Sequence, residues 1–385
     1  MDTTSSSQRF ALAALSMSTL LGALGTSIAN VGLPALSAHF AAPYARIQWI
    51  VLAYLLASTA MAVVAGRLGD RYGRRRVLLG GIAMFSIASL GCAFAASLPM
   101  LVAARALQGA GAAAMLVLSL PFAADAGGRS GRTIGLLGSV SAAGTTLGPA
   151  LGGALLAGFG WPSLFLFLAP LGLLTYACAW RGLPPGRSQA VRKDAGVQAP
   201  YGALVGIGLM TAVVMATLVI GPFHLARTLG LNGAALGLAM ACGPLAAALA
   251  GVPAGRAVDR HGASCVGRIG LACAAAGCAL LALLPAATGV AGYVIPLAVL
   301  TSGYALFQAA NNSAVMAACD ASQRGAVSGL LTLSRNLGLL GGASAMGMLF
   351  AATGMRTAFM ASLLLVGAAG LTWRRTGRTA ARRPA

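Results

Sequence analysis

Residues 66–81 read GRLGDRYGRRRVLLGG and place five arginines and one aspartate between two long apolar runs. In a chain this apolar, a short charged stretch predicts a turn between two membrane-spanning helices. Gly66 and Gly69 remove side-chain bulk where helices approach closely, and Gly73 supplies a backbone that can turn. Asp70, the one acid among the arginines, can pair locally or cap a neighbouring helix.

Composition indicates that lipid surrounds most of this chain. Of 385 residues, 58% are hydrophobic and 8% are charged, and the mean hydropathy of +0.85 lies outside the range of soluble domains. In a soluble chain a net charge of +20 would suggest a nucleic-acid partner. Here the arginines lie mostly in short loops, where they set topology. We therefore predict a membrane protein that binds no nucleic acid.

The charged stretch has a second copy, GRAVDRHG, at residues 255–262. A duplicated chain is the simplest account. The pattern Gly-x-Leu-x-Asp-Arg-x-Gly-Arg-Arg resembles the loop signature between the second and third spans of the major facilitator superfamily. The resemblance implies a gating role for residues of both copies: Gly66, Asp70, Arg71, Gly73, Arg74, Asp259 and Arg260.

Twelve apolar runs of about 18 to 25 residues are long enough to cross a hydrocarbon core of about 30 Å. An even number of spans places both ends of the chain on one side of the membrane. The expected spans are 10–34, 46–66, 77–96, 99–122, 132–158, 162–180, 202–224, 232–254, 265–284, 290–315, 325–350 and 356–373.

The distribution of arginine predicts the orientation of these spans. Most basic residues lie at the N-terminus, in the loops after spans 2, 4, 6, 8 and 10, and in the C-terminal tail, whereas the opposite loops carry only Arg46, Arg227 and Arg356. Because basic loops stay in the cytoplasm, both termini are expected there.

One break in composition divides the chain, at a segment that holds prolines and four basic residues. It reads as a flexible linker between two halves. The expected organisation is an N-terminal six-helix bundle (1–180), a cytoplasmic linker (181–200), a C-terminal six-helix bundle (201–373) and a basic cytoplasmic tail (374–385).

Spans 1 and 2 carry candidate substrate contacts. Residues 24–36, LGTSIANVGLPAL, resemble the first-span signature of drug/proton antiporters in this superfamily, except that Gly25 stands where that family has an aspartate. Asn30 can bind a substrate or make an interhelical hydrogen bond, and the sequence leaves both open. In span 2, Trp49 and Tyr54 again resemble that family, and Tyr54 is a candidate for the cavity wall.

Span 4 contains a charged residue inside the membrane. Arg105 and Gln108 are three residues apart, so both can face the same side of a helix, and their Arg-x-x-Gln-Gly pattern resembles the fourth-span motif whose arginine is linked to proton transfer. An arginine at this depth is costly unless it faces a wet cavity or a partner. We expect it to line the cavity; the alternative is that it snorkels to the external interface.

Span 5 carries a pattern that resembles the antiporter motif, which is more typical of exporters than of importers. Its glycines can form a smooth ridge for close helix contact, and its proline removes a backbone hydrogen bond and bends the helix. Such a bend can seal or reopen a central cavity. The residues of the pattern are Gly135, Gly144, Gly148, Pro149, Gly152 and Gly153.

The second half also has polar residues within its spans. Gln308, Asn311 and Asn312 share one face of span 10 at helical spacing, and side chains of this kind should point inward, away from lipid. Arg335, in span 11, is a second deep cation with no acid nearby in the sequence. These four residues complete the expected substrate cavity.

The resemblance implies an all-α, polytopic major facilitator fold: twelve helices in two pseudo-symmetric bundles around a central cavity, which rock to open it to each side in turn. The expected function is secondary active export of a small molecule, drug-like or metabolite, across a bacterial inner membrane, linked to protons. Two alternatives remain open. One is a facilitator or anion exchanger without proton coupling, and the other is a non-transporting membrane receptor.

The scarcity of titratable groups argues against an enzyme, because no nucleophile, base and orienting acid can be assembled. We predict no catalytic residues and no cofactor. The three histidines are far apart, so no metal site is expected. The expected partners are the small-molecule substrate, protons and the lipid bilayer, and the expected state is a monomer.

Overall fold

A computed structural model describes residues 3–124, 130–184, 201–283, 288–318 and 324–380. All regular secondary structure in these ranges is helical. The chain divides into two compact units: unit 1 comprises Met1–Arg192 with Asn232–Gly237, and unit 2 comprises Lys193–Leu231 with Leu238–Ala385.

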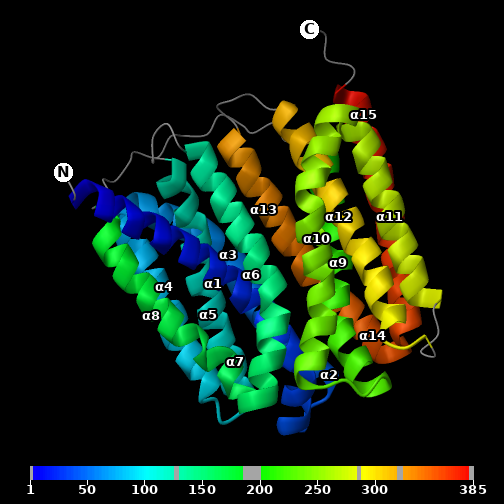
Figure 1. Cartoon of the computed structure of the whole chain (residues 1–385), viewed down its shortest axis with the longest axis horizontal. Helices are drawn as coiled ribbons and strands as arrows, with labels where there is room; N and C mark the ends of the chain where they lie inside the picture. The colour runs from blue at the N-terminus through cyan, green and yellow to red at the C-terminus, as the bar shows by residue number, and fades with distance from the viewer. Residues whose placement is uncertain (1–2, 125–129, 185–200, 284–287, 319–323, 381–385) are drawn as a thin grey trace. The chain divides into compact units, whose positions relative to one another are not determined.

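Unit 1 is built from long helices that lie side by side (Figure 1). Helix α1 packs against α6 and α8, and α5 packs against both α3 and α4. The helices are α1 (Thr3–His39), α2 (Tyr44–Ile47), α3 (Trp49–Tyr72), α4 (Arg74–Ala93), α5 (Leu98–Ala124), α6 (Ser130–Phe159), α7 (Pro162–Leu166) and α8 (Leu168–Gly182).

In unit 2, α9 packs against α13 and α15, and α11 packs against α12 and α15. A π-helix, η3, interrupts the eleventh predicted span. The elements are α9 (Tyr201–Thr228), α10 (Gly233–His261, of which residues 233–237 belong to unit 1), α11 (Ala263–Leu283), α12 (Ala291–Ala317), α13 (Arg324–Gly341), η3 (Gly342–Met346), α14 (Gly347–Thr353) and α15 (Met355–Ala380).

Within the described ranges these elements form twelve long helical segments, if α2–α3, α7–α8 and α13–η3–α14 are each counted as one. Eleven are long and apolar enough to cross a membrane. The remaining one, α6, has 30 residues, and the side chains of part of it lie outside the described residues. The predicted all-α, polytopic fold is therefore confirmed, and the protein crosses the membrane many times.

The charged stretch that opened the sequence is a turn of one residue. Helix α3 continues to Tyr72 and α4 begins at Arg74, so only Gly73 turns, with a φ of 94°. The turn at Gly73 is confirmed, and the helices extend beyond the approximate span ends expected at residues 66 and 77. Arginine and leucine are good helix formers, and arginine side chains reach water from a helical backbone, so the helices have no reason to end early.

The second copy folds in the same way. Helix α10 continues through Asp259 to His261, and α11 begins at Ala263. Gly262 alone makes the turn, with a φ of 80°. A φ in this range favours glycine because it lacks a Cβ atom. The duplication inferred from the sequence therefore extends to local structure, since both copies form a helix–glycine–helix hairpin.

The predicted domain boundaries at 1–180, 181–200, 201–373 and 374–385 stay a prediction. Residues 185–200, most of the expected linker, lie outside the described residues. The last helix, α15, continues to Ala380, beyond the predicted end of its span at residue 373.

Candidate functional site

Arg105 forms the centre of a buried polar cluster in unit 1. Its side chain has no exposed surface. Its Nε donates to the carbonyl oxygen of Ile50 at 3.0 Å, and its Nη1 donates to the carbonyl oxygen of Gly25 at 3.0 Å and to Oε1 of Gln108 at 2.5 Å. The guanidinium carbon lies 4.3 Å from the centre of the Tyr54 ring. One arginine thus joins α1, α3 and α5.

The cluster extends to α4 through Gln108. Nε2 of Gln108 donates to the Ser89 hydroxyl at 2.7 Å, which donates to the carbonyl oxygen of Phe85 at 2.7 Å. We call Gly25, Tyr54, Ser89, Arg105 and Gln108 the Arg105 cluster. The spacing of Arg105 and Gln108 predicted their common face, whereas nothing in the sequence pointed to Ser89.

The guanidinium of Arg105 contacts backbone carbonyl groups and aromatic rings. The second ring is that of Phe165, whose centre lies 5.8 Å from the guanidinium carbon. Among the residues the structure describes, its Nη2 has no hydrogen-bond partner and no carboxylate contacts it. Burial of a charge costs several kcal/mol even after relaxation, so several groups must stabilise the guanidinium at once. The alternative that Arg105 snorkels to the external interface is wrong, because its side chain is fully buried.

Gly25 is the member of the Arg105 cluster that lies on α1. A Cβ atom at this position would lie 3.1 Å from the Tyr54 hydroxyl oxygen and 3.1 Å from the Phe85 ring. A side chain therefore fits only if these neighbours move by a few tenths of an ångström. Gly25 stands where the resembled antiporters carry an aspartate. It lies beside Arg105, which has no carboxylate partner among the described residues.

Asn30 is also fully buried. Its Nδ2 donates to the carbonyl oxygen of Thr26, on its own helix, at 3.1 Å. Its Oδ1 has no partner among the described residues, so no interhelical hydrogen bond of Asn30 is found there. All four expected cavity residues of unit 1, Asn30, Tyr54, Arg105 and Gln108, are buried in this structure, and their contact with substrate stays a prediction.

In unit 2 the expected cavity residues differ in exposure. Asn311, on α12, is fully buried, and neither atom of its amide group has a hydrogen-bond partner among the described residues. Gln308 and Asn312 are half-buried. Arg335, on α13, has an exposed side chain, so it is not enclosed within its unit as Arg105 is. The role of these four residues in substrate binding stays a prediction.

The predicted glycine ridge of α6 lies against α1. A Cβ atom at Gly144 would lie 2.9 Å from Cβ of Ala23, and one at Gly152 would lie 3.1 Å from the carbonyl oxygen of Ile28. At Gly148 the added atom would overlap the side chain of Ser27. Spaced four residues apart, the three glycines let two helix backbones approach closely.

Three other residues of this pattern were singled out in the sequence. Gly153 lies against α10, where an added Cβ atom would be 2.6 Å from Cα of Gly237. Pro149 is buried and lies inside the continuous helix α6. The bend expected there stays a prediction. Gly135 also lies in α6, and its surroundings are outside the described part of the chain.

A second ridge, which the sequence reasoning missed, occurs in unit 2. A Cβ atom at Gly338 would lie 3.0 Å from Cα of Gly208, and one at Gly342 would lie 2.8 Å from Cα of Ala212. Gly338 and Gly342 are four residues apart, so they repeat on α13 and η3 the spacing that α6 uses in unit 1. The signal was present in the sequence as Gly-x-x-Gly-Gly at 338–342.

The expected gating residues lie at helix ends. Asp70 and Arg71 lie in the last turn of α3, and Arg74 is the first residue of α4. Arg71 is exposed, with its guanidinium 5.3 Å from the Tyr72 ring. In the second copy, Asp259 and Arg260 are exposed in the last turn of α10. The side chain of Asp70 is not among those described, and Gly66 is helical.

Arg75, in the same charged stretch, connects two helices. Its guanidinium donates a hydrogen bond to the carbonyl oxygen of Trp180 at the end of α8, and lies 5.3 Å from the Trp180 ring. This contact fastens the start of α4 to α8. Among the described residues, no group of three His, Cys, Asp or Glu side chains could hold a metal ion.

Comparison with known proteins identifies the class. The model of the Major Facilitator Superfamily matches the chain twice, over residues 15–203 and 202–385. YebQ of Escherichia coli, an uncharacterized transporter, is 28% identical over 91% of both chains. The multidrug efflux pump LfrA of Mycolicibacterium smegmatis is 29% identical over 96% of this chain and 85% of its own length. Three further relatives match over less than half of either chain.

A solved structure agrees with the family match. The crystal structure of a bacterial homolog of the human lysosomal transporter Spinster superposes with a TM-score of 0.81 over 96% of both chains, at 17% identity. At this identity the likeness is one of fold. The molecule is a helical membrane protein with many spans, and its two halves match the same family model. This places it in the class of transporters that are built from two helical bundles. The chain belongs to the major facilitator superfamily.

Membership of this family confirms that the chain is a transporter and not an enzyme, because the relatives that it matches over nearly its whole length are transporters. Its resemblance to drug efflux families, inferred from motifs, is confirmed by the relatives named as multidrug efflux and resistance proteins.

Proposed function

We propose that this transporter exports a small molecule, either a drug-like compound or a metabolite, from the cytoplasm by alternating access. Unit 1 and unit 2 are the two rocking bodies in this mechanism. Export is linked to protons, which move into the cytoplasm as the substrate moves out of it. The protein acts as a monomer in the inner membrane of a bacterium, with both termini in the cytoplasm, because its basic loops share that side.

The observation that carries the export proposal is the close contact of α6 with α1. The pattern that makes this contact is the one that resembles the antiporter motif, and each of Gly144, Gly148 and Gly152 meets α1 where a larger side chain would not fit without movement. Full-length similarity to the multidrug efflux pump LfrA supports the same direction of transport.

The Arg105 cluster supports a preference for neutral or anionic substrates. Arg105 is a buried positive charge, and the described side chains offer no carboxylate to balance it. At an effective dielectric of about 20, a unit charge some 8 Å away contributes about 2 kcal/mol, in favour of an anion and against a cation. Any proton coupling then runs through the substrate, a histidine or a chain of waters.

A second candidate function follows from the same observation. A facilitator or anion exchanger needs no intramembrane acid, and Gly25 occupies the position where related drug/proton antiporters carry one. Uptake into vesicles of purified protein separates the two functions. Export linked to protons collapses when a protonophore dissipates the pH gradient, whereas facilitated diffusion or exchange continues.

The acid of the charged stretch provides a test of gating. Asp70 lies in the last turn of α3, where the helix dipole disfavours a negative charge, and five arginines lie within six residues of it in the sequence. We expect Asp70→Asn to reduce transport severalfold while the protein still inserts and folds. The measurement is the initial rate of uptake per inserted protein.

Asp259→Asn is the matched control in the second copy. Asp259 is exposed and has fewer arginines near it in the sequence, so we expect a smaller loss of rate. Equal rates for wild type and Asp70→Asn would rule out a gating role for this residue.

Charge selectivity provides a test of the Arg105 cluster. We expect wild-type protein to export a weak acid faster than a lipophilic cation of similar size. Gly25→Asp places a carboxylate beside Arg105 and should increase export of the cation. The measurement is the ratio of the two export rates under an imposed pH gradient.

Two further variants separate charge from size at this position. Gly25→Ala adds the crowded Cβ atom alone, and Gly25→Asn adds a neutral side chain of the size of aspartate. Neither should increase cation export. Rapid, gradient-driven export of the cation by wild type would refute the proposed selectivity.

A further inference from the structure

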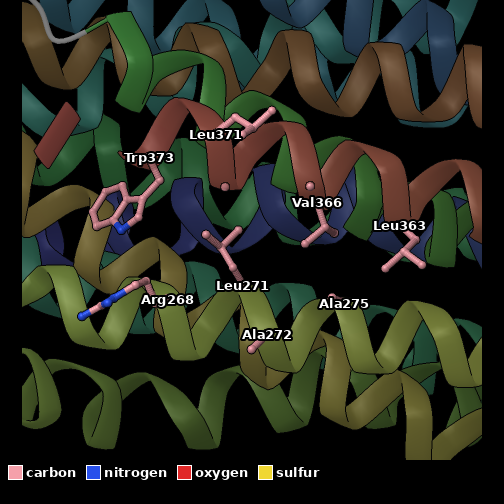
Figure 2. A pocket seen from close by; sticks show the side chains of 10 residues that line it. Arg268, Leu271, Ala272, Ala275, Leu363, Val366, Leu371 and Trp373 are labelled. Carbon is pink, nitrogen blue, oxygen red and sulfur yellow. The ribbon is translucent and has the colours of Figure 1, made fainter. Parts of the chain in front are cut away.

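A groove of about 570 Å³ runs between α11 and α15 on the surface of unit 2. Figure 2 shows Arg268 and Trp373 at one end, and Ala275 and Leu363 at the other. Between these ends the walls are aliphatic, with Leu271 on α11 and Val366 on α15 among the lining residues. The groove is therefore apolar along its length and has a cation at one end.

The polar end of the groove lies near the start of α11, where the expected topology has a membrane surface. Arg268 is the sixth residue of α11, about 7 Å into the helix at 1.5 Å per residue, and its side chain is exposed. Its Nε donates to the carbonyl oxygen of Ser264 at 3.3 Å, which directs the side chain back along the helix. An exposed arginine at this depth is favourable when it snorkels to an anionic headgroup.

Trp373 closes the same end. Its ring packs edge-on against Phe307 at 5.4 Å between ring centres, and a Cβ atom at Gly267 would lie 2.6 Å from it. The ring is therefore held tightly, with 6% of its surface exposed. Tryptophan favours the level of the lipid headgroups, which agrees with the depth inferred for Arg268.

The length of the groove matches one leaflet of a bilayer. From Leu363 to Trp373 the α15 wall rises about 15 Å at 1.5 Å per residue, and half of a hydrocarbon core of about 30 Å is the same length. One acyl chain therefore fits along the wall, with its headgroup beside Arg268.

Glycine keeps this wall hollow. A Cβ atom at Gly367 would meet nothing within 4 Å, and one at Gly370 would meet only Leu271, at 3.8 Å. Unlike the ridge glycines of α6, Gly367 is not needed for contact between helices. Its effect is to leave space open in the groove.

We propose that this groove binds one anionic phospholipid, with the phosphate at Arg268 and an acyl chain along α11 and α15. Under the proposed orientation the lipid belongs to the cytoplasmic leaflet, which is rich in anionic lipid. The sequence that follows Trp373 favours the same charge of lipid, since Arg374, Arg375 and Arg378 come directly after it.

Two substitutions remove the two halves of this site. Arg268→Gln removes the cation and keeps a shorter, polar, unbranched side chain, and Gly367→Leu adds bulk to the groove at a position where a Cβ atom would meet nothing within 4 Å. Their matched controls are Arg356→Gln, an exposed arginine near the other end of α15, and Gly251→Leu, an exposed glycine whose Cβ atom would also meet nothing within 4 Å.

The experiment measures lipid bound to the intact, detergent-purified protein by native mass spectrometry during titration with phosphatidylglycerol. We expect one tightly bound lipid, with affinity reduced at least about tenfold by Arg268→Gln, the equivalent of one charge-assisted hydrogen bond. Gly367→Leu should abolish the tight site, and both controls should retain it. Thermal unfolding without added lipid checks that all four variants are folded.

Three results would overturn the proposal: equal affinity for zwitterionic phosphatidylcholine, unchanged binding by Gly367→Leu, or an equal loss caused by Arg356→Gln. Glycerol phosphate, which lacks acyl chains, should not compete at the same concentrations. If it did compete, the site would bind free phosphate groups and not a lipid. No transport assay is involved, so failure here leaves the proposed export untouched.

Discussion

Gly148→Leu is expected to reduce transport to less than about a tenth of the wild-type rate, a change in activation free energy of about 1.4 kcal/mol or more. The Cβ atom alone would lie 2.8 Å from Cβ of Ser27 and closer still to its hydroxyl, and leucine adds three more carbons. Helices α1 and α6 must then separate along the whole ridge. The measurement is the initial uptake rate per inserted protein, together with Tm in detergent, which should fall.

The same helix supplies the control. A Cβ atom at Gly158 would meet nothing within 4 Å, so Gly158→Leu should leave both transport and Tm close to wild type. A compensating pair tests the contact itself. Gly148→Ala should be impaired, and Ser27→Gly in the same chain should restore transport, because the next contact of the added Cβ atom is the Ile28 nitrogen at 3.3 Å.

If Gly148→Leu transported normally, the ridge would have no mechanical role and the export proposal would lose its main support. If Ser27→Gly failed to rescue Gly148→Ala, the effect of the alanine would not come from the contact between α1 and α6.

Arg105→Ala is expected to cause a loss of similar size. Its removal deprives the carbonyl oxygens of Gly25 and Ile50 and the Oε1 of Gln108 of a donor at once. The two carbonyl oxygens lie inside helices and keep their intrahelical donors, so the main costs are the unpartnered Oε1 of Gln108, about 1 to 3 kcal/mol, and the cavity left by the side chain. We expect at least about a tenfold lower transport rate and a lower Tm.

Arg105→Lys separates the charge from the shape of the guanidinium. Lysine keeps the charge but lacks the planar fork that reaches several acceptors. If the cluster acts by joining α1, α3 and α5, the lysine variant should be nearly as impaired as the alanine variant. If the field of the charge dominates, lysine should restore export of a weak acid.

Arg335→Ala is the control for loss of a predicted cavity arginine. Its side chain is exposed, so its removal should leave Tm unchanged whatever it does to transport. An Arg105→Ala protein that unfolds no earlier than Arg335→Ala would contradict the bridging role given to Arg105.

The sequence predicted the parts of the site that depend on local spacing. Arg105 and Gln108 are three positions apart, and Gly144 and Gly148 are four positions apart, so a helix places each pair on one face. It also predicted the turn at Gly73, because a chain reversal within one residue requires a φ that glycine adopts readily.

The remaining features depend on contacts between helices that are far apart in the chain. The donors of Arg105 end on backbone carbonyl groups of α1 and α3, and every residue has such a group, so no side chain in the sequence identifies Gly25 or Ile50 as partners. Ser89 is equally inconspicuous, since serine is common in membrane helices. The helix ends were misplaced for another reason. The charged residues were expected to lie in a loop, whereas residues 67–76 are all helical except Gly73.

The π-helix η3 changes how the eleventh span must be read. A π turn holds one more residue than an α turn, so residues after Met346 are rotated by about 100°, the angle of one residue, from the positions that continuous α-helical counting assigns. A helical wheel drawn through the whole span therefore places α14 on the wrong faces. Gly342–Met346 is also the one place in this span where deletion of a residue would restore a regular α-helix. A deletion elsewhere in the span would change the register of the helix that follows it.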